Sequence, residues 1–490
     1  MNSIVSQASK AKRPIRAVQF GEGNFLRAFV DHMLDIANEK GIFDGSVAVI
    51  KPTNRGNLDK FIRQDCLYTV ILRGRENGEV VNESRLVTCI DRAVSPYERP
   101  EMLRELAQID SLEYIVSNTT EAGIALTGGE QLSDQPCMSF PGKLAQLLYH
   151  RFRHFGGDRE KGVVVLPVEL IEKNGEKLKK YILELAEKWN LEADFADWLD
   201  EACLFCNTLV DRIVTGFPAP EAEALYEKLG YEDALLDVGE PFGLWVIECE
   251  NPEALEKKLP LDAIGLPVIY TRDLTPYRER KVRILNGAHT SSVPAAYLEG
   301  EEIVRGMMHN PVTRAYLNRA VYDELLPTVN LPENEVRAFA QAVMERFDNP
   351  FIDHRLLDIS LNSVSKWRAR VLPSLKDTVQ ATGKLPTCLA FSLAALIAFY
   401  APVSREENQL TGQRDGVPYP IRDDQAVLDF FWESRARVFE ESFVRDLLAR
   451  ADFWGEDLNE TAGLSETAAS WLTVIKNEGM KAALARAAEE

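Results

Sequence analysis

The sequence predicts an α/β fold in two parts: an N-terminal domain built on a parallel sheet and a mainly α-helical C-terminal domain. Within 15–168, short apolar runs typical of buried strands alternate with helical patterns, the order expected of a parallel sheet. From Thr275 onward the strand signals nearly vanish and long helical periodicities replace them. A chain of 490 residues is long enough for both parts. We therefore expect domains at 1–270 and 271–490, with a linker at 267–276.

A glycine loop follows the first predicted strand. Residues 15–20 form an apolar run, and residues 29–40 carry apolar side chains at helical spacing. Between them, Gly21 permits a tight turn and Gly23 lets the backbone approach a pyrophosphate at the helix N-terminus. With a further strand at 46–50, this order opens a Rossmann-like dinucleotide-binding fold. A purely structural turn is the alternative. The cofactor-binding candidates in the loop are Phe20, Gly21, Glu22, Gly23 and Asn24.

The remaining elements of the first half follow the same alternation. Further strands are expected at 68–72, 86–90, 114–117 and 162–168, with a helix that begins near Phe140. Asn118 and Thr120 directly follow the strand at 114–117. Because the carboxyl ends of such strands line the cofactor crevice, Asn118 and Thr120 are also cofactor-binding candidates. The alternative is that they cap a helix.

The second half shows helical periodicity almost throughout. Helices are expected at 315–325, 332–347, 352–372, 389–400, 424–448 and 466–488. The sequence has no internal repeat at a fixed period and no low-complexity segment. The second domain is therefore predicted to be mainly α-helical.

The segment Lys281-Val-Arg-Ile-Leu-Asn286-Gly-Ala-His289 contains the candidate catalytic residues Lys281, Asn286 and His289. On a helix with about 100° per residue, Lys281, His289 and Asn286 fall at roughly 0°, 80° and 140°, on one broad face. A lysine can carry a proton, and an amide and an imidazole can donate hydrogen bonds to an oxygen that gains charge. These groups suit the interconversion of an alcohol and a ketone. Because the helix from Lys281 to His289 spans roughly 12 Å, we expect Lys281 at a loop–helix junction or stretched along a groove. An amphipathic basic helix is the alternative.

This spacing resembles the Lys-x4-Asn-x2-His signature of the polyol-specific long-chain dehydrogenases, the mannitol dehydrogenase family. The resemblance implies that Lys281 is the catalytic acid/base and that Asn286 and His289 bind the reacting oxygen. The glycine loop is similar to the family's GxGxFxRA form, which adds Phe25 and Arg27 to the cofactor-binding candidates. The resemblance extends over residues 15–450 and implies a Rossmann-like domain followed by a helical one.

Other matches to the family suggest where the substrate binds. The segment Asn207-Thr-Leu-Val-Asp211-Arg-Ile resembles a family segment that borders the substrate. An aspartate there can accept hydrogen bonds from two hydroxyl groups, although Asp211 could instead form a structural pair with the adjacent arginine. Lys366 matches a family lysine near the substrate, with an outward salt bridge as the alternative. Arg283 belongs to a cationic cluster at 278–283, which is either a solvated face or a site for an anion.

The choice of cofactor rests on the resemblance, which implies NAD. The strand at 46–50 ends without the acidic residue that usually holds the adenosine ribose of NAD. Lys51 and Arg55 could instead meet a 2′-phosphate, so NADP stays open as an alternative.

Departures from the family pattern bear on the substrate. Glu169 and Leu170 stand where the family usually has Asp and Asn, so Asn286 lacks its usual partner in binding the oxygen. Asp358 replaces a family arginine. This replacement suggests a substrate tail different from that of the mannitol enzymes. The segments at 19–28, 166–175 and 362–367 are most similar to the tagaturonate reductase (altronate oxidoreductase) branch. That branch implies a keto-uronate substrate and an aldonate product.

Three alternatives stay open. The first is another member of the family, acting on fructuronate, mannonate or a mannitol-type polyol. The second is an NADP-linked sugar reductase. The third is a non-catalytic nucleotide-sensing protein that kept the fold, against which the intact set Lys281, Asn286 and His289 argues.

Composition excludes several other classes. The net charge of −20 disfavours nucleic acid and anionic membranes as partners. No apolar run approaches the roughly 20 residues of a membrane span, and the N-terminus lacks the pattern of a secretory signal. The odd number of cysteines, 7, suggests a reducing, cytoplasmic location. Cys203 and Cys206 form a lone CxxC motif, for which buried thiols are a better account than zinc or redox use, so no metal site is predicted. The oligomeric state is not predicted.

Overall fold

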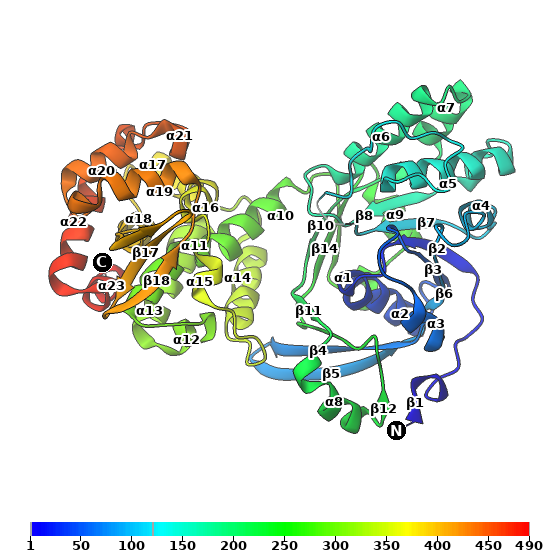
Figure 1. The fold of residues 1–490 in the computed structure, drawn as a ribbon, viewed down its shortest axis with the longest axis horizontal. Coiled ribbons are helices and arrows are strands. Elements are labelled where there is room, and N and C mark those ends of the chain that lie inside the picture. Colours follow the sequence, from blue (N-terminus) through cyan, green and yellow to red (C-terminus); the bar gives the residue numbers. More distant parts are fainter. Residues whose placement is uncertain (1, 120–121, 490) are drawn as a thin grey trace. The chain divides into compact units, whose positions relative to one another are not determined.

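The computed structural model describes residues 2–119 and 122–489 (Figure 1). The chain divides into two compact units. The first, unit 1, comprises Met1–Gly74 and Val80–Leu274, and the second, unit 2, comprises Arg75–Glu79 and Thr275–Glu490.

A six-stranded parallel sheet forms the centre of unit 1. Its strands are β2 (Ile15–Phe20), β3 (Ser46–Ile50), β6 (Ile90–Val94), β7 (Tyr114–Ser117), β8 (Val164–Pro167) and β9 (Leu204–Phe205). They lie in the order β6-β3-β2-β7-β8-β9, and all neighbours are parallel. Numbered within the sheet, this is the order 3-2-1-4-5-6 of dinucleotide-binding folds. The predicted Rossmann-like fold is confirmed.

Both faces of this sheet are buried, which explains why its strands appear as unbroken apolar runs in the sequence. In β2, Ala17 packs into one core while Val18 and Phe20 pack into the other. The second core is completed by residues of four helices: α4 (Met102–Ala107), α5 (Phe140–Phe155), α6 (Asn174–Lys188) and α7 (Ala193–Glu201). The first core receives Phe29 and Met33 from the helical stretch that follows the glycine loop.

The ends of α5 follow from local sequence. The Ser139 hydroxyl accepts a hydrogen bond from the Gly142 backbone N–H at 2.9 Å, and Pro141 occupies the first turn, where it costs no hydrogen bond. The helix ends at Gly156, whose φ of +63° is left-handed. Arg151 within α5 is fully buried, and its guanidinium donates to four backbone carbonyls.

Smaller sheets complete unit 1. One has the order β11 (Val214–Gly216), β13 (Asp237–Gly239), β4 (Tyr68–Glu76), β5 (Glu79–Val87). Another has the order β10 (Asn207–Asp211), β14 (Leu244–Glu248), β15 (Val268–Thr271). A third pairs β1 (Asn2–Ser3) with β12 (Tyr231–Glu232). Helices α3 (Asp59–Arg63), α8 (Ala222–Leu229) and α9 (Pro252–Lys258) lie between these strands in the sequence.

The prediction of a single strand at 86–90 is wrong. Strand β5 ends at Val87 and β6 begins at Ile90. Strands β4 and β5 are joined by Asn77 and Gly78, whose φ values are +53° and +82°. Asn-Gly with two positive φ angles is the usual two-residue hairpin turn, so the sequence did contain a signal for this hairpin. The tip of the hairpin belongs to unit 2, where the N–H groups of Asn77 and Gly78 donate to the Glu345 carboxylate at 2.9 and 3.0 Å.

Unit 2 is mainly helical, as predicted. Its helices are α10 (Thr275–Arg280), α11 (Gly287–Glu299), α12 (Val304–His309), α13 (Pro311–Arg319), α14 (Glu333–Phe347), α15 (Leu356–Ile359), α16 (Ser363–Arg370), α17 (Leu372–Thr382), α18 (Thr387–Phe399), α19 (Gln425–Glu433), α20 (Glu441–Leu448), α21 (Ala451–Trp454), α22 (Leu464–Glu478) and α23 (Met480–Glu489). Almost every residue of α18 is buried, and this helix packs against α11 and α22. The Glu324 carboxylate caps it by accepting from the N–H groups of Cys388 and Leu389, both at 2.9 Å.

Several expectations for the second half are wrong in detail. Three antiparallel strands that were not predicted, β16 (Ser404–Glu406), β17 (Gln409–Arg414) and β18 (Val417–Ile421), form a meander. The helix expected at 352–372 is interrupted at Asn362 (φ +53°), and the one at 466–488 is interrupted at Gly479 (φ +86°). The helix expected at 424–448 is two helices, α19 and α20. None of the helices in the described part of the chain has the length and apolarity that a membrane span requires.

Candidate active site

The glycine loop lies at the carboxyl edge of the sheet, where β2 and β7 are neighbours. Gly21 has a φ of +129°, and a Cβ added there would lie 2.9 Å from the Asn118 carbonyl oxygen and 2.9 Å from Leu26 Cδ1. Only glycine fits this position. A Cβ on Gly23 would meet no atom within 4 Å, and Gly23 caps the following helix without a side-chain hydrogen bond. The space beside Gly23 is therefore open at a helix N-terminus, which fits a pyrophosphate.

The residues around this loop divide into two groups. Asn24 is exposed, whereas Glu22 and Phe25 are half-buried, and burial raises the pKa of Glu22. Phe20 and Arg27, in contrast, point into the interior. The Phe20 ring packs against Phe140 with ring centroids 5.0 Å apart.

The buried side chain of Arg27 anchors the residues after the glycine loop to neighbouring parts of unit 1. Its guanidinium donates to the Leu235 carbonyl and lies 3.5 Å from the Asp237 carboxylate, with the Tyr68 ring 5.3 Å away. Arg27 begins a π-helical turn, η2 (Arg27–Asp31), which lies between α1 (Asn24–Leu26) and α2 (His32–Glu39). The sequence placed Phe20 and Arg27 at the cofactor. Both side chains are buried, so contact with a cofactor would have to come from the backbone of these two residues.

Asn118 follows β7 at the same edge of the sheet as the glycine loop. Its N–H donates to the Phe20 carbonyl at 3.1 Å, and its side-chain amide donates to the Val168 carbonyl at 3.4 Å. Thr120, the other candidate there, lies outside the described residues. Nearby, the buried Glu169 carboxylate accepts from the Ser117 hydroxyl at 3.0 Å and from the Thr119 N–H at 2.9 Å. Leu170 is 59% exposed, and because its side chain is a hydrocarbon it cannot replace the hydrogen bonds of the family asparagine.

Asn207 and Asp211 lie at opposite ends of β10 and are both buried. The side-chain amide of Asn207 donates to Glu176 at 2.9 Å and to Glu248 at 2.7 Å, and its oxygen accepts from the Glu176 N–H at 3.1 Å. These bonds hold α6 and β14 to β10. Asn207 was predicted to bind substrate, but the amide nitrogen and the oxygen of its side chain are already engaged in these hydrogen bonds.

Lys281 and Asn286 bound a π-helical turn, η6 (Lys281–Asn286), within one continuous helix from α10 to α11. The Gly287 N–H donates to the Val282 carbonyl, the i→i+5 bond of such a turn. Residues five apart therefore lie nearly on one face, whereas in an α-helix they would differ by about 140°. The expected loop–helix junction at Lys281 is wrong. The π-turn brings Lys281 and Asn286 together instead, and both are half-buried.

His289 follows on α11, and its surroundings keep it neutral. The imidazole stacks on Phe347 with centroids 4.1 Å apart and meets the His354 ring edge-on at 5.7 Å. Burial is the main reason that the pKa of His289 lies well below its usual range, and the charges of Arg346, Arg370 and Lys366 lower it further. The Nε2 atom is buried and has no hydrogen-bond partner within the described ranges.

The predicted cations have different surroundings. Arg283 forms an ion pair with Asp377 and donates to the Thr328 carbonyl at 2.8 Å, so its guanidinium is already engaged within unit 2. Lys366 is half-buried on α16, and its Nζ donates to the Ile359 carbonyl at 2.9 Å. The sequence reasoning missed Arg370, one helical turn beyond Lys366. The spacing of four residues places it on the same face of α16 as Lys366, but only the tertiary structure shows that Arg283 is already paired with Asp377.

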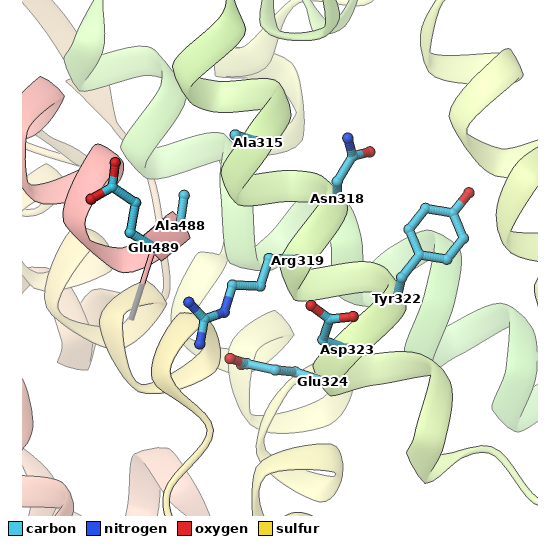
Figure 2. Close-up of a pocket in the computed structure, with 8 residues that line it drawn as sticks. All are labelled: Ala315, Asn318, Arg319, Tyr322, Asp323, Glu324, Ala488 and Glu489. Carbon is cyan, nitrogen blue, oxygen red and sulfur yellow. The ribbon is translucent and has the colours of Figure 1, made fainter.

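Three other features of the described residues concern metal binding, cysteine chemistry and a surface pocket. They contain no group of three or more His, Cys, Asp or Glu residues arranged to hold a metal ion. The cysteines are all free and buried. A surface depression of about 850 Å³ in unit 2 is shown in Figure 2; its lining includes Arg319, Asp323 and Glu324. Its lining contains none of the predicted site residues, and the Glu324 carboxylate already caps α18.

Comparison with known proteins covers nearly the whole chain. The family model described as the mannitol dehydrogenase Rossmann domain matches residues 15–261, and the mannitol dehydrogenase C-terminal domain matches residues 273–476. An altronate oxidoreductase of Enterobacter sp. (strain 638) is 42% identical over 477 residues, with 96% of each chain covered. Its counterpart in Escherichia coli (strain K12) is 43% identical over 480 residues, with 97% of each chain covered.

Solved structures show the same fold. A D-sorbitol dehydrogenase in substrate-free form superposes with a TM-score of 0.77 at 20% identity, covering 96% of this chain and 95% of that one. Mannitol 2-dehydrogenase of Pseudomonas fluorescens, in a ternary complex with NAD and D-mannitol, gives a TM-score of 0.64 at 23% identity, covering 98% and 95%. With both domains matched and the lysine, asparagine and histidine in place, the chain belongs to the mannitol dehydrogenase family and is an oxidoreductase that acts on CH–OH groups.

Proposed function

We propose that this protein reduces D-tagaturonate to D-altronate with NADH, reversibly. The supporting observation for the chemistry is the π-turn, which sets Lys281 and Asn286 on one face just before His289. The substrate is inferred from the relatives named altronate oxidoreductase, which are 42–43% identical over almost their whole length. The reaction balances as keto acid plus NADH plus H⁺ giving hydroxy acid plus NAD⁺.

In this proposal, residues of unit 2 donate hydrogen bonds and a proton to the reacting oxygen. When bound, the nicotinamide cofactor would supply the hydride that the keto carbon receives. Asn286 donates a hydrogen bond to the oxygen as it gains negative charge. His289 is neutral, so one ring nitrogen keeps a proton that it can donate in the same way. The Lys281 ammonium gives the oxygen its proton, and in the direction of oxidation the neutral amine accepts that proton.

The cofactor is proposed to bind along the β2–β7 edge. Gly21, Gly23 and Asn118 would hold it, because the loop leaves open space beside Gly23 at a helix N-terminus. Of the two cations that could meet the 2′-phosphate of NADP, Arg55 is exposed and Lys51 is not. Lys51, which could have met a 2′-phosphate, is only 2% exposed, and its Nζ donates to the Thr53 carbonyl at 2.8 Å.

Steady-state assays test the substrate. Oxidation of NADH, followed by its absorbance, is measured with D-tagaturonate, D-fructuronate and D-fructose, and with NADPH in place of NADH. Turnover is expected to be fastest with tagaturonate and NADH. Faster turnover of fructuronate or fructose would identify that compound as the substrate in place of tagaturonate. Nucleotide binding without any turnover would support a nucleotide-sensing protein.

The cofactor site is tested by Gly23→Ala. Because Gly23 has an ordinary φ of −71° and an open side, the folded protein should tolerate the methyl group. The methyl group would, however, occupy the space where the backbone meets the pyrophosphate. We expect the Kd for NADH to rise at least about 10-fold, a cost of about 1.4 kcal/mol, with an unchanged melting temperature. Gly128→Ala, at an exposed position with equally open space, is the matched control and should change neither quantity. Unchanged NADH affinity in Gly23→Ala would place the cofactor elsewhere.

A further inference from the structure

Lys366 and Arg370 place two positive charges one turn apart on the same face of α16. Side chains at i and i+4 are neighbours on a helix, and like charges at that spacing destabilise it. Both groups are half-buried. Burial lowers the pKa of each, and Arg370 lowers the pKa of Lys366 further.

The guanidinium of Arg370 has no partner in the described part of the chain: no hydrogen bond or ion pair joins it to another residue there. A half-buried cation without a partner loses hydration and gains nothing in return. Arg283, in contrast, is paired with Asp377. Arg370 is therefore the cation of this region that is poised to receive an anion from outside the protein.

Arg370 also lies beside the predicted catalytic residues. Helix α16 packs against both η6 and α11. At the contact, a Cβ added to Gly287 would lie 3.1 Å from the Arg370 carbonyl oxygen, so the backbones approach closely next to Asn286. The charges of Arg370 and Lys366 both reach His289 and help to lower its pKa. Like the Arg370 guanidinium, the buried His289 Nε2 atom has no hydrogen-bond partner among the described residues.

We propose that Arg370, assisted by Lys366, binds the carboxylate of a sugar-acid substrate. This inference rests on the proposed function and assigns a role that the family resemblance did not. A guanidinium offers two parallel N–H donors that match a carboxylate. The ammonium of Lys366 has three donors, of which the Ile359 carbonyl uses one. A six-carbon keto-uronate carries its carboxylate at one end and its keto carbon next to the other.

Arg370 then determines specificity and is not a catalytic residue. A neutral ketose of the same length has a hydroxymethyl group where the keto-uronate has its carboxylate. Such a molecule gains nothing from Arg370, and its binding leaves the guanidinium without a partner. The protein should therefore discriminate strongly against neutral sugars, and this discrimination should depend on Arg370.

The test compares Arg370→Gln with the unchanged full-length protein on D-tagaturonate and on D-tagatose, its neutral counterpart. We expect kcat/KM for tagaturonate to fall at least about 100-fold, mainly through KM, as loss of a charged hydrogen-bonding partner does. Activity on tagatose and affinity for NADH should not change. Arg370→Lys should recover part of the loss. Arg368→Gln, at an exposed position on the same helix, is the matched control and should behave like the unchanged protein.

Two results would overturn the proposal: an equal loss on both sugars, which indicates a structural role, or an unchanged KM for tagaturonate. Calorimetric binding of D-altronate separates this inference from the proposed function, because it requires no turnover. If the unchanged protein binds altronate and Arg370→Gln binds it equally well, Arg370 is not the receptor. If the unchanged protein neither binds altronate nor reduces tagaturonate, the proposed function fails, and the inference fails with it.

Discussion

Replacing Lys281 by alanine is expected to lower kcat roughly 1,000-fold, because general acid–base catalysis typically contributes about 100- to 10,000-fold. Lys281 lies at the start of the π-turn in unit 2, whereas the proposed cofactor loop lies in unit 1. The affinity for NADH should therefore stay nearly unchanged. The measurement is single-turnover reduction of tagaturonate, together with NADH binding followed by fluorescence.

Lys376→Ala is the matched control for this prediction. Lys376 is also a lysine of unit 2, but its Nζ is exposed and pairs with Glu456 at 2.7 Å. Exposed pairs contribute little, so this variant should keep full activity. Equal losses of kcat and NADH affinity in Lys281→Ala would argue against an acid/base role and for damage to the fold.

Replacing Arg151 by methionine is expected to lower the free energy of unfolding by about 4 kcal/mol. The guanidinium donates to the carbonyls of Lys161 (2.7 Å), Ala107 (3.0 Å), Ile109 (2.8 Å) and Leu112 (2.9 Å). Methionine fills most of the volume but leaves these acceptors without a donor. Leu112 precedes β7 and Lys161 precedes β8, so the loss falls on the two strands that lead to Asn118 and Glu169.

Thermal and urea unfolding measure this loss, with Arg153→Met as control. Arg153 lies two residues further along the same helix, but its side chain is 61% exposed and forms an ion pair with Glu192 at the surface. Its removal should change stability by no more than about 0.5 kcal/mol. Similar unfolding midpoints for the two variants would show that the buried network contributes little.

The parts of the fold that the sequence predicted well are those whose burial is complete. Strands β2, β3 and β7 appear as apolar runs because both faces of their sheet are covered. The meander β16–β18 was missed because its strands are short and partly exposed. The breaks at Asn362 and Gly479 depend on single residues with positive φ, which helical periodicity does not register.

The candidate site, like the fold, was predicted from the sequence only in part. The sequence predicted that Lys281, Asn286 and His289 share one broad helical face, but it did not predict the π-turn between Lys281 and Asn286. A π-turn is a change in backbone hydrogen bonding, and side-chain periodicity carries no mark of it. Nor could the sequence distinguish Arg283 from Arg370. The partner of Arg283 is Asp377, far away in the chain, and only tertiary structure shows which of the two cations is already paired.

The hairpin β4–β5 affects how this protein can be divided. The chain passes from one unit to the other at three points, after Gly74, Glu79 and Leu274. A fragment that starts at Thr275 would lack the hairpin tip, and Glu345 would lose the two backbone N–H groups that it binds. Asn77 and Gly78 precede Glu345 by 268 and 267 residues, so during synthesis the tip leaves the ribosome long before its partner in the helical unit. The helical unit is thus completed by a segment made long before it, and genetic separation of the two units should cut outside the hairpin.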